Sequence, residues 1–168
     1  VLAIFDNEEV GSGTKQGAGS PVLRTIIERI VFNLGGGPED LYRAIHNSFM
    51  ISADMAHALH PNYAEKHDPT NHPLMNEGPV IKINANQKYV TDGDSAAVFQ
   101  TICRLAGVPY QTFVNQSDMA GGSTLGNILL SQMEMRGVDI GNPMWVRETG
   151  GTLDHHYIIQ AFTTFYNI

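Results

Sequence analysis

The sequence predicts an α/β fold in which helices cover a largely parallel sheet. Short apolar stretches alternate along the chain with longer stretches of helical periodicity, which is typical of successive strand–helix units. The chain has 168 residues, 42% of them hydrophobic, enough for the core of one ordinary domain. No repeat or low-complexity linker divides it, so we treat residues 1–168 as one unit.

The first half of the chain contains two predicted strands and two predicted helices. Residues 1–5 (VLAIF) form an apolar run and predict a buried strand. Pro21 suits the first turn of a helix, and isoleucines at helical spacing extend that helix over residues 21–33. A Gly-Gly-Gly-Pro break precedes a second helix over residues 38–46, and residues 49–53 predict a short buried strand.

The second half begins with a long polar stretch, residues 54–79, which is rich in His, Asn and Pro. It is too long for an idle connection in a compact domain, so we interpret it as functional. A strand is predicted over residues 80–84, and a helix over 92–105 ends at Gly-Val-Pro. The remaining predictions are a strand at 111–115 and helices at 125–135 and 152–165.

Composition excludes several classes of protein. The net charge of −7 argues against nucleic acid or an anionic membrane as a partner. No apolar run approaches the roughly 20 residues that span a bilayer. The single cysteine, Cys103, excludes an internal disulfide and fits a reducing compartment. The chain opens with Val1 in an apolar run and shows no signal peptide, so we expect the latter part of a longer protein.

Acidic side chains follow two of the predicted strands. Asp6, Glu8 and Glu9 end the first strand, and Asp54 ends the strand before the polar stretch. The carboxyl ends of parallel strands meet at one edge of a sheet, where ligands bind. Clustered carboxylates need a cation, so a metal site is one interpretation and a solvated acidic loop is the other. If the segment is extended, Glu8 and Glu9 point to opposite faces and serve different purposes.

Other chemistry-bearing residues are less specific. His57 and His60 would share a face if this segment is helical, although Pro61 would end such a helix. Histidine suits zinc, but structural histidines are common and the spacing is not the HExxH signature. Lys82 is a cation on an apolar strand and suits a carboxylate ligand, or is an ordinary edge-strand lysine. The glycine-rich turn 118–126 lacks a phosphate-binding lysine and predicts an anion site or a capped turn.

Rival catalytic motifs are weaker. Adjacent glutamates do not suggest a glycosidase pair, whose carboxyls flank a sugar bond about 5 to 9.5 Å apart. No Gly-x-Ser-x-Gly sequence supports a serine hydrolase, and Cys103 lacks the flanking residues of a thiol nucleophile.

Four motifs together resemble the aspartyl aminopeptidases, the M18 family of zinc metallopeptidases. They are FDNEEVGSGTKQGA, SFMISADMAHALHPNYAEKH, GPVIKINANQKYVT and GGSTLGNI, in this order along nearly the whole chain. The resemblance implies that residues 1–168 are the C-terminal part of a catalytic domain with a layered α/β/α, zinc-exopeptidase-like sheet. It also implies a cytoplasmic enzyme that removes N-terminal Asp or Glu from peptides, and that forms a homo-oligomer, typically a dodecamer.

The resemblance also implies roles for individual residues. Glu8 is the expected general base, and Glu9 and Asp54 are expected ligands of a dinuclear zinc site in which Mn²⁺ or Co²⁺ could substitute. Lys82 and Tyr89 are expected at the acidic side chain of the substrate. The resemblance places a further residue, His60, near that site or at a subunit contact.

The sequence departs from the family pattern in its metal ligands. One His and a bridging Asp are expected from a part that precedes this chain. Another His is expected just before Arg147, but the chain passes from Trp145 directly to Val146. The explanation that we favour is that a few residues are missing from the sequence between Trp145 and Val146. The alternative is a metal-deficient, inactive relative that serves as an assembly or binding scaffold.

Overall fold

The computed structural model describes the backbone of residues 1–168 and every side chain except that of Glu148. Its centre is a four-stranded sheet in the order β1-β4-β2-β3. The strands are β1 (Phe49–His57), β2 (Val80–Ile83), β3 (Gln111–Val114) and β4 (Arg136–Met144). β1 pairs with β4 in parallel, as β2 does with β3, whereas β2 and β4 are antiparallel. The α/β class is confirmed, with one antiparallel pairing at the centre of the sheet.

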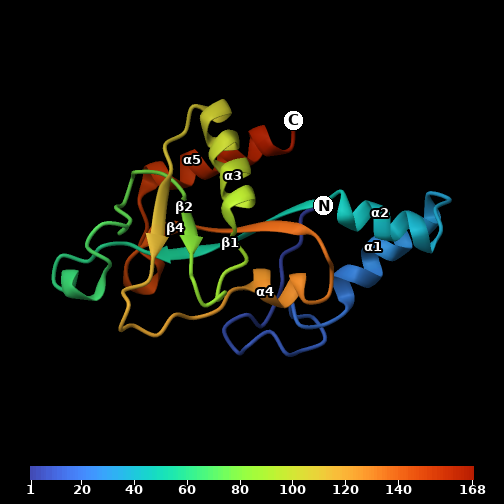
Figure 1. Cartoon of the computed structure of the whole chain (residues 1–168), viewed down its shortest axis with the longest axis horizontal. Coiled ribbons are helices and arrows are strands. Elements are labelled where there is room, and N and C mark those ends of the chain that lie inside the picture. Colours follow the sequence, from blue (N-terminus) through green and yellow to red (C-terminus); the bar gives the residue numbers. More distant parts are fainter.

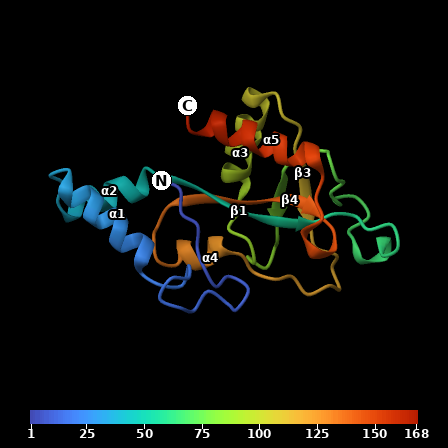
Figure 2. The same cartoon turned by 180° about the vertical axis from the view of Figure 1, so that it is seen from behind.

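Helices cover both faces of this sheet (Figures 1 and 2). α3 (Gly93–Ala106) and α5 (Thr152–Phe165) pack on one face, where Phe99, Ile102 and Ile140 form the main core. The short α4 (Leu125–Leu130) lies on the other face. Because helices cover both faces, apolar side chains can be buried on each side of the sheet.

A helical hairpin extends from one end of the sheet. α1 (Val22–Asn33) and α2 (Pro38–His46) agree closely with the predicted helices and lie together beyond the end of β1 (Figures 1 and 2). α2 anchors the hairpin through buried Leu41 and Ile45, which pack with Leu129 and Met133. α1 has no fully buried residue, so its contribution to the core comes from partly buried side chains.

The sequence prediction missed β4 and overextended α4. The segment RGVDIGNPM contains two glycines, a proline and an aspartate, which are unfavourable in isolated strands. It becomes a strand because nine of its positions pair with β1. α4 ends at Leu130 rather than at residue 135, and the chain then turns into β4. Two 3₁₀ turns, Ala64–Lys66 and Val146–Glu148, complete the secondary structure.

The strand predicted over residues 1–5 is wrong. This segment pairs with no described strand, and the side chains of Val1, Leu2 and Ile4 are 83%, 75% and 88% exposed. A strand needs a neighbour to satisfy its backbone groups, and the described sheet does not supply one here. Only Phe5 packs against a core cluster. Separately, no helix in the described chain has the length and hydrophobicity needed to cross a membrane.

Candidate active site

An ion pair between two strands marks the candidate site. Asp54 lies on β1 and Lys82 on β2, and the Lys82 Nζ is 3.2 Å from the Asp54 Oδ2. The two side chains are unequally exposed, 5% for Lys82 and 45% for Asp54. β4 runs between them and places Gly141 beside Asp54. A Cβ on Gly141 would lie 2.7 Å from the Met55 backbone, so only glycine fits the closely spaced strands.

A tight turn brings the acidic motif to this ion pair. The Gly11 N–H donates to the Glu8 carbonyl and the Ser12 N–H to the Asn7 carbonyl, each at 2.9 Å. Burial is the largest cause that raises the pKa of Glu8, followed by the charges of Asp54 and Glu9, while Lys82 opposes the shift. Glu8 therefore lies within electrostatic range of Asp54 and Lys82. The predicted extended geometry of Glu8 and Glu9 is wrong, since both lie in a turn.

Tyr89 lies against the same lysine. Its side chain is 6% exposed, its ring centroid is 6.4 Å from that of Phe113, and the Lys82 Nζ lies 5.6 Å from its centroid. Burial is the main cause that raises the pKa of the Tyr89 phenol, and a hydrogen bond with Asn115 opposes it. Tyr89 and Lys82 thus form one wall of the site, with an apolar ring beside a cation.

His60 lies in a separate aromatic cluster. Its ring centroid is 5.3 Å from that of Tyr63 and 5.3 Å from that of Trp145, and its Nδ1 accepts the Asn62 N–H at 3.2 Å. β1 extends through His57, so the predicted end of this strand at residue 53 is wrong and Asp54 lies inside the strand rather than at its end. The segment is not helical at His57, and His57 and His60 share no helical face. No described hydrogen bond or ring contact joins His60 to Asp54 or Lys82.

The polar stretch after β1 does gather histidines. Burial lowers the pKa of His67, and the charges of His57 and His72 lower it further, while Glu65 opposes the shift. The ring nitrogen Nδ1 of His72 lies 2.9 Å from the Asp68 carbonyl oxygen, which fixes that side chain within the loop. His57 and His72 therefore lie within electrostatic range of His67.

The described side chains do not make up a metal site by themselves. Among them, no group of three or more His, Cys, Asp and Glu residues lies close enough to hold a metal ion. Glu9 and Asp54 are carboxylates of the type that zinc accepts, but Asp54 has Lys82 as its cation in this structure. The residues present therefore do not complete a zinc site.

The junction where a further His is expected is a strained turn. β4 ends at Met144, the Trp145 N–H donates to the Thr149 carbonyl at 2.9 Å, and Arg147 has a φ of 57°. A positive φ is unfavourable for a residue with a Cβ. A tight connection directly after Trp145 accounts for this conformation.

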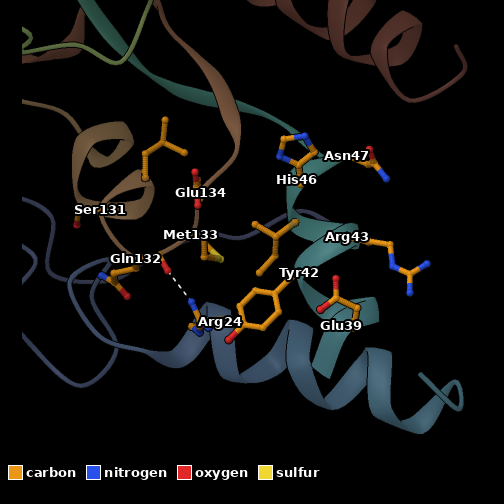
Figure 3. A pocket seen from close by; sticks show the side chains of 12 residues that line it. Arg24, Glu39, Tyr42, Arg43, His46, Asn47, Ser131, Gln132, Met133 and Glu134 are labelled. Carbon is orange, nitrogen blue, oxygen red and sulfur yellow. Dashed lines mark hydrogen bonds between the residues drawn. The ribbon is translucent and has the colours of Figure 1, made fainter. Parts of the chain in front are cut away.

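A separate cleft lies between the helical hairpin and the turn after α4 (Figure 3). Its volume is about 720 Å³, and it carries charges of both signs, including Arg24, Arg43, Glu39 and Glu134. The Arg24 guanidinium closes one side by donating to the Gln132 carbonyl at 2.8 Å, the bond drawn in Figure 3. None of the predicted site residues lines this cleft.

The sequence prediction overlooked three polar side chains that each bury an oxygen atom without a hydrogen-bond partner among the described residues. Asp139 is fully buried, and its Oδ1 has no hydrogen-bond partner among the described residues. The same holds for Thr124 Oγ1 and Asn142 Oδ1. An aspartate between two apolar residues, Val138 and Ile140, was the signal that could have identified Asp139.

An open α/β sheet that carries carboxylates and a buried lysine on one face offers a binding site for a charged ligand. Residues 1–166 match the family described as "Aminopeptidase I zinc metalloprotease (M18)", and the chain belongs to this family. This confirms the resemblance seen in the four motifs.

Known relatives support the same assignment. A probable M18 family aminopeptidase 2 from Clostridium acetobutylicum is 58% identical over 172 residues, which cover 100% of this chain and 40% of the relative. An aspartyl aminopeptidase from Aspergillus oryzae is 44% identical over 182 residues, 99% of this chain and 36% of the relative. A solved mApe1 dodecamer from S. cerevisiae superimposes with a TM-score of 0.83 at 28% identity, covering 97% of this chain and 36% of that one.

These comparisons describe a chain shorter than its relatives. The chain spans about 40% of the length of the Clostridium acetobutylicum relative. The alignment of 172 residues is also four longer than the 168-residue chain, so that relative has at least four residues within the aligned region that this chain lacks. Their location between Trp145 and Val146 stays a prediction.

Proposed function

We propose that the protein containing this chain is a metalloaminopeptidase that removes N-terminal Asp or Glu from peptides. The observation that carries this proposal is the burial of Lys82, which is only 4% exposed. Its ammonium lies 3.2 Å from the Asp54 carboxylate. A buried cation is unfavourable without a carboxylate beside it. An acidic substrate side chain would offer a second such carboxylate. The name of the Aspergillus oryzae relative, aspartyl aminopeptidase, supports this preference.

The residues around Lys82 have complementary proposed roles. Glu8, close to Asp54, would accept a proton from the attacking water and transfer it to the leaving amine. Lys82 and Tyr89 would bind the acidic side chain of the substrate together, because the Lys82 ammonium lies 5.6 Å from the centroid of the Tyr89 ring. His60 would lie at the periphery, near the substrate or a subunit contact.

The proposed cofactor is a pair of zinc ions, with Mn²⁺ or Co²⁺ as alternatives. The family description supports zinc. Zinc supplies a Lewis acid for the peptide carbonyl and lowers the pKa of a bound water. From this chain, Glu9 and Asp54 are the proposed ligands, and the remaining ligands would come from residues outside the 168 present.

The proposed setting is a larger assembly. Residues 1–168 would be the C-terminal part of the catalytic domain of a cytoplasmic homo-oligomer. The dodecamer of the S. cerevisiae relative supports the oligomer, and light scattering on the full-length protein would measure its mass.

The test uses full-length protein supplied with Zn²⁺, Mn²⁺ or Co²⁺ and peptides that differ only in their first residue. We expect N-terminal Asp to be released at least about tenfold faster than Ala. Glu8→Gln should retain metal and lose about 10²- to 10⁴-fold in kcat, the usual contribution of a general base. Glu39→Gln, on the exposed surface of α2, is the control.

Two results would contradict the proposal. If the protein released no N-terminal residue with any of the three metals, it would not be an aminopeptidase. If the protein also bound no metal, the inactive scaffold would be the better description. Activity that survives Glu8→Gln would show that Glu8 is not the base.

A further inference from the structure

A buried aspartate on β4, Asp139, has no role in the function proposed above. It is fully buried and lies on the strand between β1 and β2. Ile140 pairs with Ile81 in the antiparallel ladder, which puts Asp139 and Lys82 at adjacent positions of neighbouring strands. Burying a carboxylate is costly, so its contacts indicate what it does for the fold.

The contacts of Asp139 tie down the segment that carries Tyr89. The Val90 N–H donates to the Asp139 Oδ2 at 2.7 Å. The Asp139 N–H donates to the Thr91 Oγ1 at 3.0 Å, and that hydroxyl lies 3.4 Å from the Asp139 carbonyl oxygen. The two residues directly after Tyr89 are therefore both bound to β4.

This attachment determines where the Tyr89 ring lies. The ring is nearly buried against Phe113 and faces the Lys82 ammonium. A shift of the backbone at Val90 would break a hydrogen bond to a buried carboxylate, which is among the stronger kinds in proteins. A backbone shift that carries Tyr89 away from Lys82 would therefore have to break this contact with Asp139.

The first turn of α4 also confines this carboxylate. A Cβ on Gly126 would lie 2.8 Å from both carboxylate oxygens of Asp139, so a larger residue would displace the carboxylate. Asp139 Oδ1 and Thr124 Oγ1 are buried without a hydrogen-bond partner among the described residues. The carboxylate is thus enclosed between this turn and the Tyr89 segment.

We propose that Asp139 is a positioning residue that fixes the backbone after Tyr89 and so holds Tyr89 against Lys82, the arrangement that selects an acidic N-terminal residue. The selectivity part rests on the proposed function. The positioning part concerns only atoms of this chain and can be tested without activity.

The first test is structural and uses the full-length protein. In crystal structures of Asp139→Ala and Gly126→Ala, we expect the Tyr89 ring to move by about 1 Å or more from its position over Lys82. Asp139→Asn keeps an acceptor for the Val90 N–H and should leave the ring in place. Gly122→Ala is the matched control, because a Cβ there meets no atom within 4 Å.

The second test measures kcat and KM for peptides that begin with Asp or Ala. In Asp139→Ala and Gly126→Ala, we expect the Asp-to-Ala ratio of kcat/KM to fall about 10- to 100-fold, through KM for the acidic peptide. Asp139→Asn should restore the ratio. If Asp139 had a purely structural role, kcat/KM would fall equally for the peptides that begin with Asp and with Ala.

The outcomes separate this inference from the proposed function. If Tyr89 keeps its position in both variants, the inference is overturned, whatever the activity. If the wild type shows no acidic preference, the proposed function fails while the crystal structures still decide the positioning role. If Asp139→Ala does not fold, Gly126→Ala reaches the same carboxylate from the opposite side.

Discussion

Lys82 has a structural contact in this chain and a proposed role in substrate binding. Its ammonium is buried, and its described ion-pair partner is the more exposed Asp54. Removing the lysine would leave a carboxylate that water can still solvate, which limits the effect on stability. Substitution at this position therefore tests substrate selection without a large folding defect.

We predict that Lys82→Met in the full-length protein raises KM for a peptide with N-terminal Asp by about tenfold or more, since a charge-assisted contact is worth roughly 1.5–3 kcal/mol. KM for a peptide with N-terminal Ala should change little. Lys88→Met, at an exposed position in the loop after β2, is the control. An equal loss for both peptides in Lys82→Met would assign Lys82 a structural role only.

The acidic residues of the site were easier to predict than their geometry. Glu8, Glu9 and Asp54 follow apolar runs, which is a local signal. That Glu8 and Glu9 lie in a turn depends on hydrogen bonds within residues 7–12, and local alternation predicts an extended segment instead. Asp139 was missed because its contacts join residues 48 and 49 positions apart.

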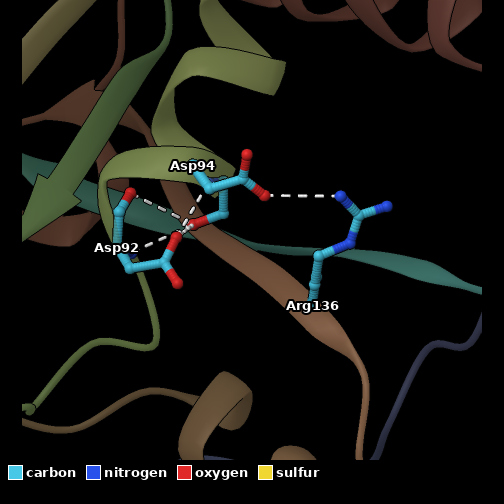
Figure 4. A network of polar contacts seen from close by, with 4 residues as sticks. Asp92, Asp94 and Arg136 are labelled. Carbon is cyan, nitrogen blue, oxygen red and sulfur yellow. Dashed lines mark hydrogen bonds and ion pairs between the residues drawn. The ribbon is translucent and has the colours of Figure 1, made fainter. Parts of the chain in front are cut away.

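At the scale of elements, α3 has the most complete set of end signals in the chain. Its N-cap, Asp92, accepts the Ser95 N–H at 2.8 Å, and the Asp92 N–H donates to the Ser95 Oγ at 3.0 Å (Figure 4). Gly107 ends the helix with a φ of 66°, a left-handed conformation that glycine adopts readily. Both signals are local, which explains why this helix was predicted almost to the residue.

We predict that Asp92→Ala lowers the free energy of unfolding by about 1 kcal/mol, the usual value of an N-cap. Asp94→Ala is a matched control in the same network, where Arg136 lies 3.3 Å away with both side chains more than half exposed (Figure 4). Its effect should be below about 0.5 kcal/mol. Denaturant titration of the full-length variants would measure both changes in the free energy of unfolding. Equal changes for Asp92→Ala and Asp94→Ala would contradict the role of Asp92 as the N-cap.

The pH dependence of this cap has a definite sign. The hydrogen bonds from Ser95 lower the pKa of Asp92 below its ordinary value of 3.8. The stabilisation by the cap is therefore present above pH 3.8 and is lost as the pH falls through the lower, folded-state pKa.

At the scale of the whole molecule, Asp154 joins two distant parts of the chain. Its buried carboxylate accepts the Asn76 N–H at 2.6 Å and the Gly78 N–H at 2.9 Å. In return, the Asn76 Oδ1 accepts the Leu153 N–H at 3.0 Å at the start of α5. This reciprocal contact fixes the loop that leads into β2, the strand of Lys82.

We predict a stability effect of opposite pH dependence at this contact. Burial is the main cause that raises the pKa of Asp154 above 3.8, so the folded state binds its proton more readily than the unfolded state does. The free energy of unfolding of the wild type should therefore increase relative to Asp154→Asn as the pH falls through the folded-state pKa towards the unfolded-state value of 3.8. Denaturant titrations at several pH values would check this, and a constant difference would contradict it.

The α/β class, the approximate bounds of four helices and of three of the four strands, and the four motifs of the M18 family could all be predicted from local sequence patterns. These properties depend on periodicity, caps and residue identity, which neighbouring residues carry. Only the tertiary structure decided that residues 136–144 are a strand, that β2 runs antiparallel to it, and that Lys82 meets Asp54. Each of these depends on pairing between residues far apart in the chain, and local patterns do not encode such pairing.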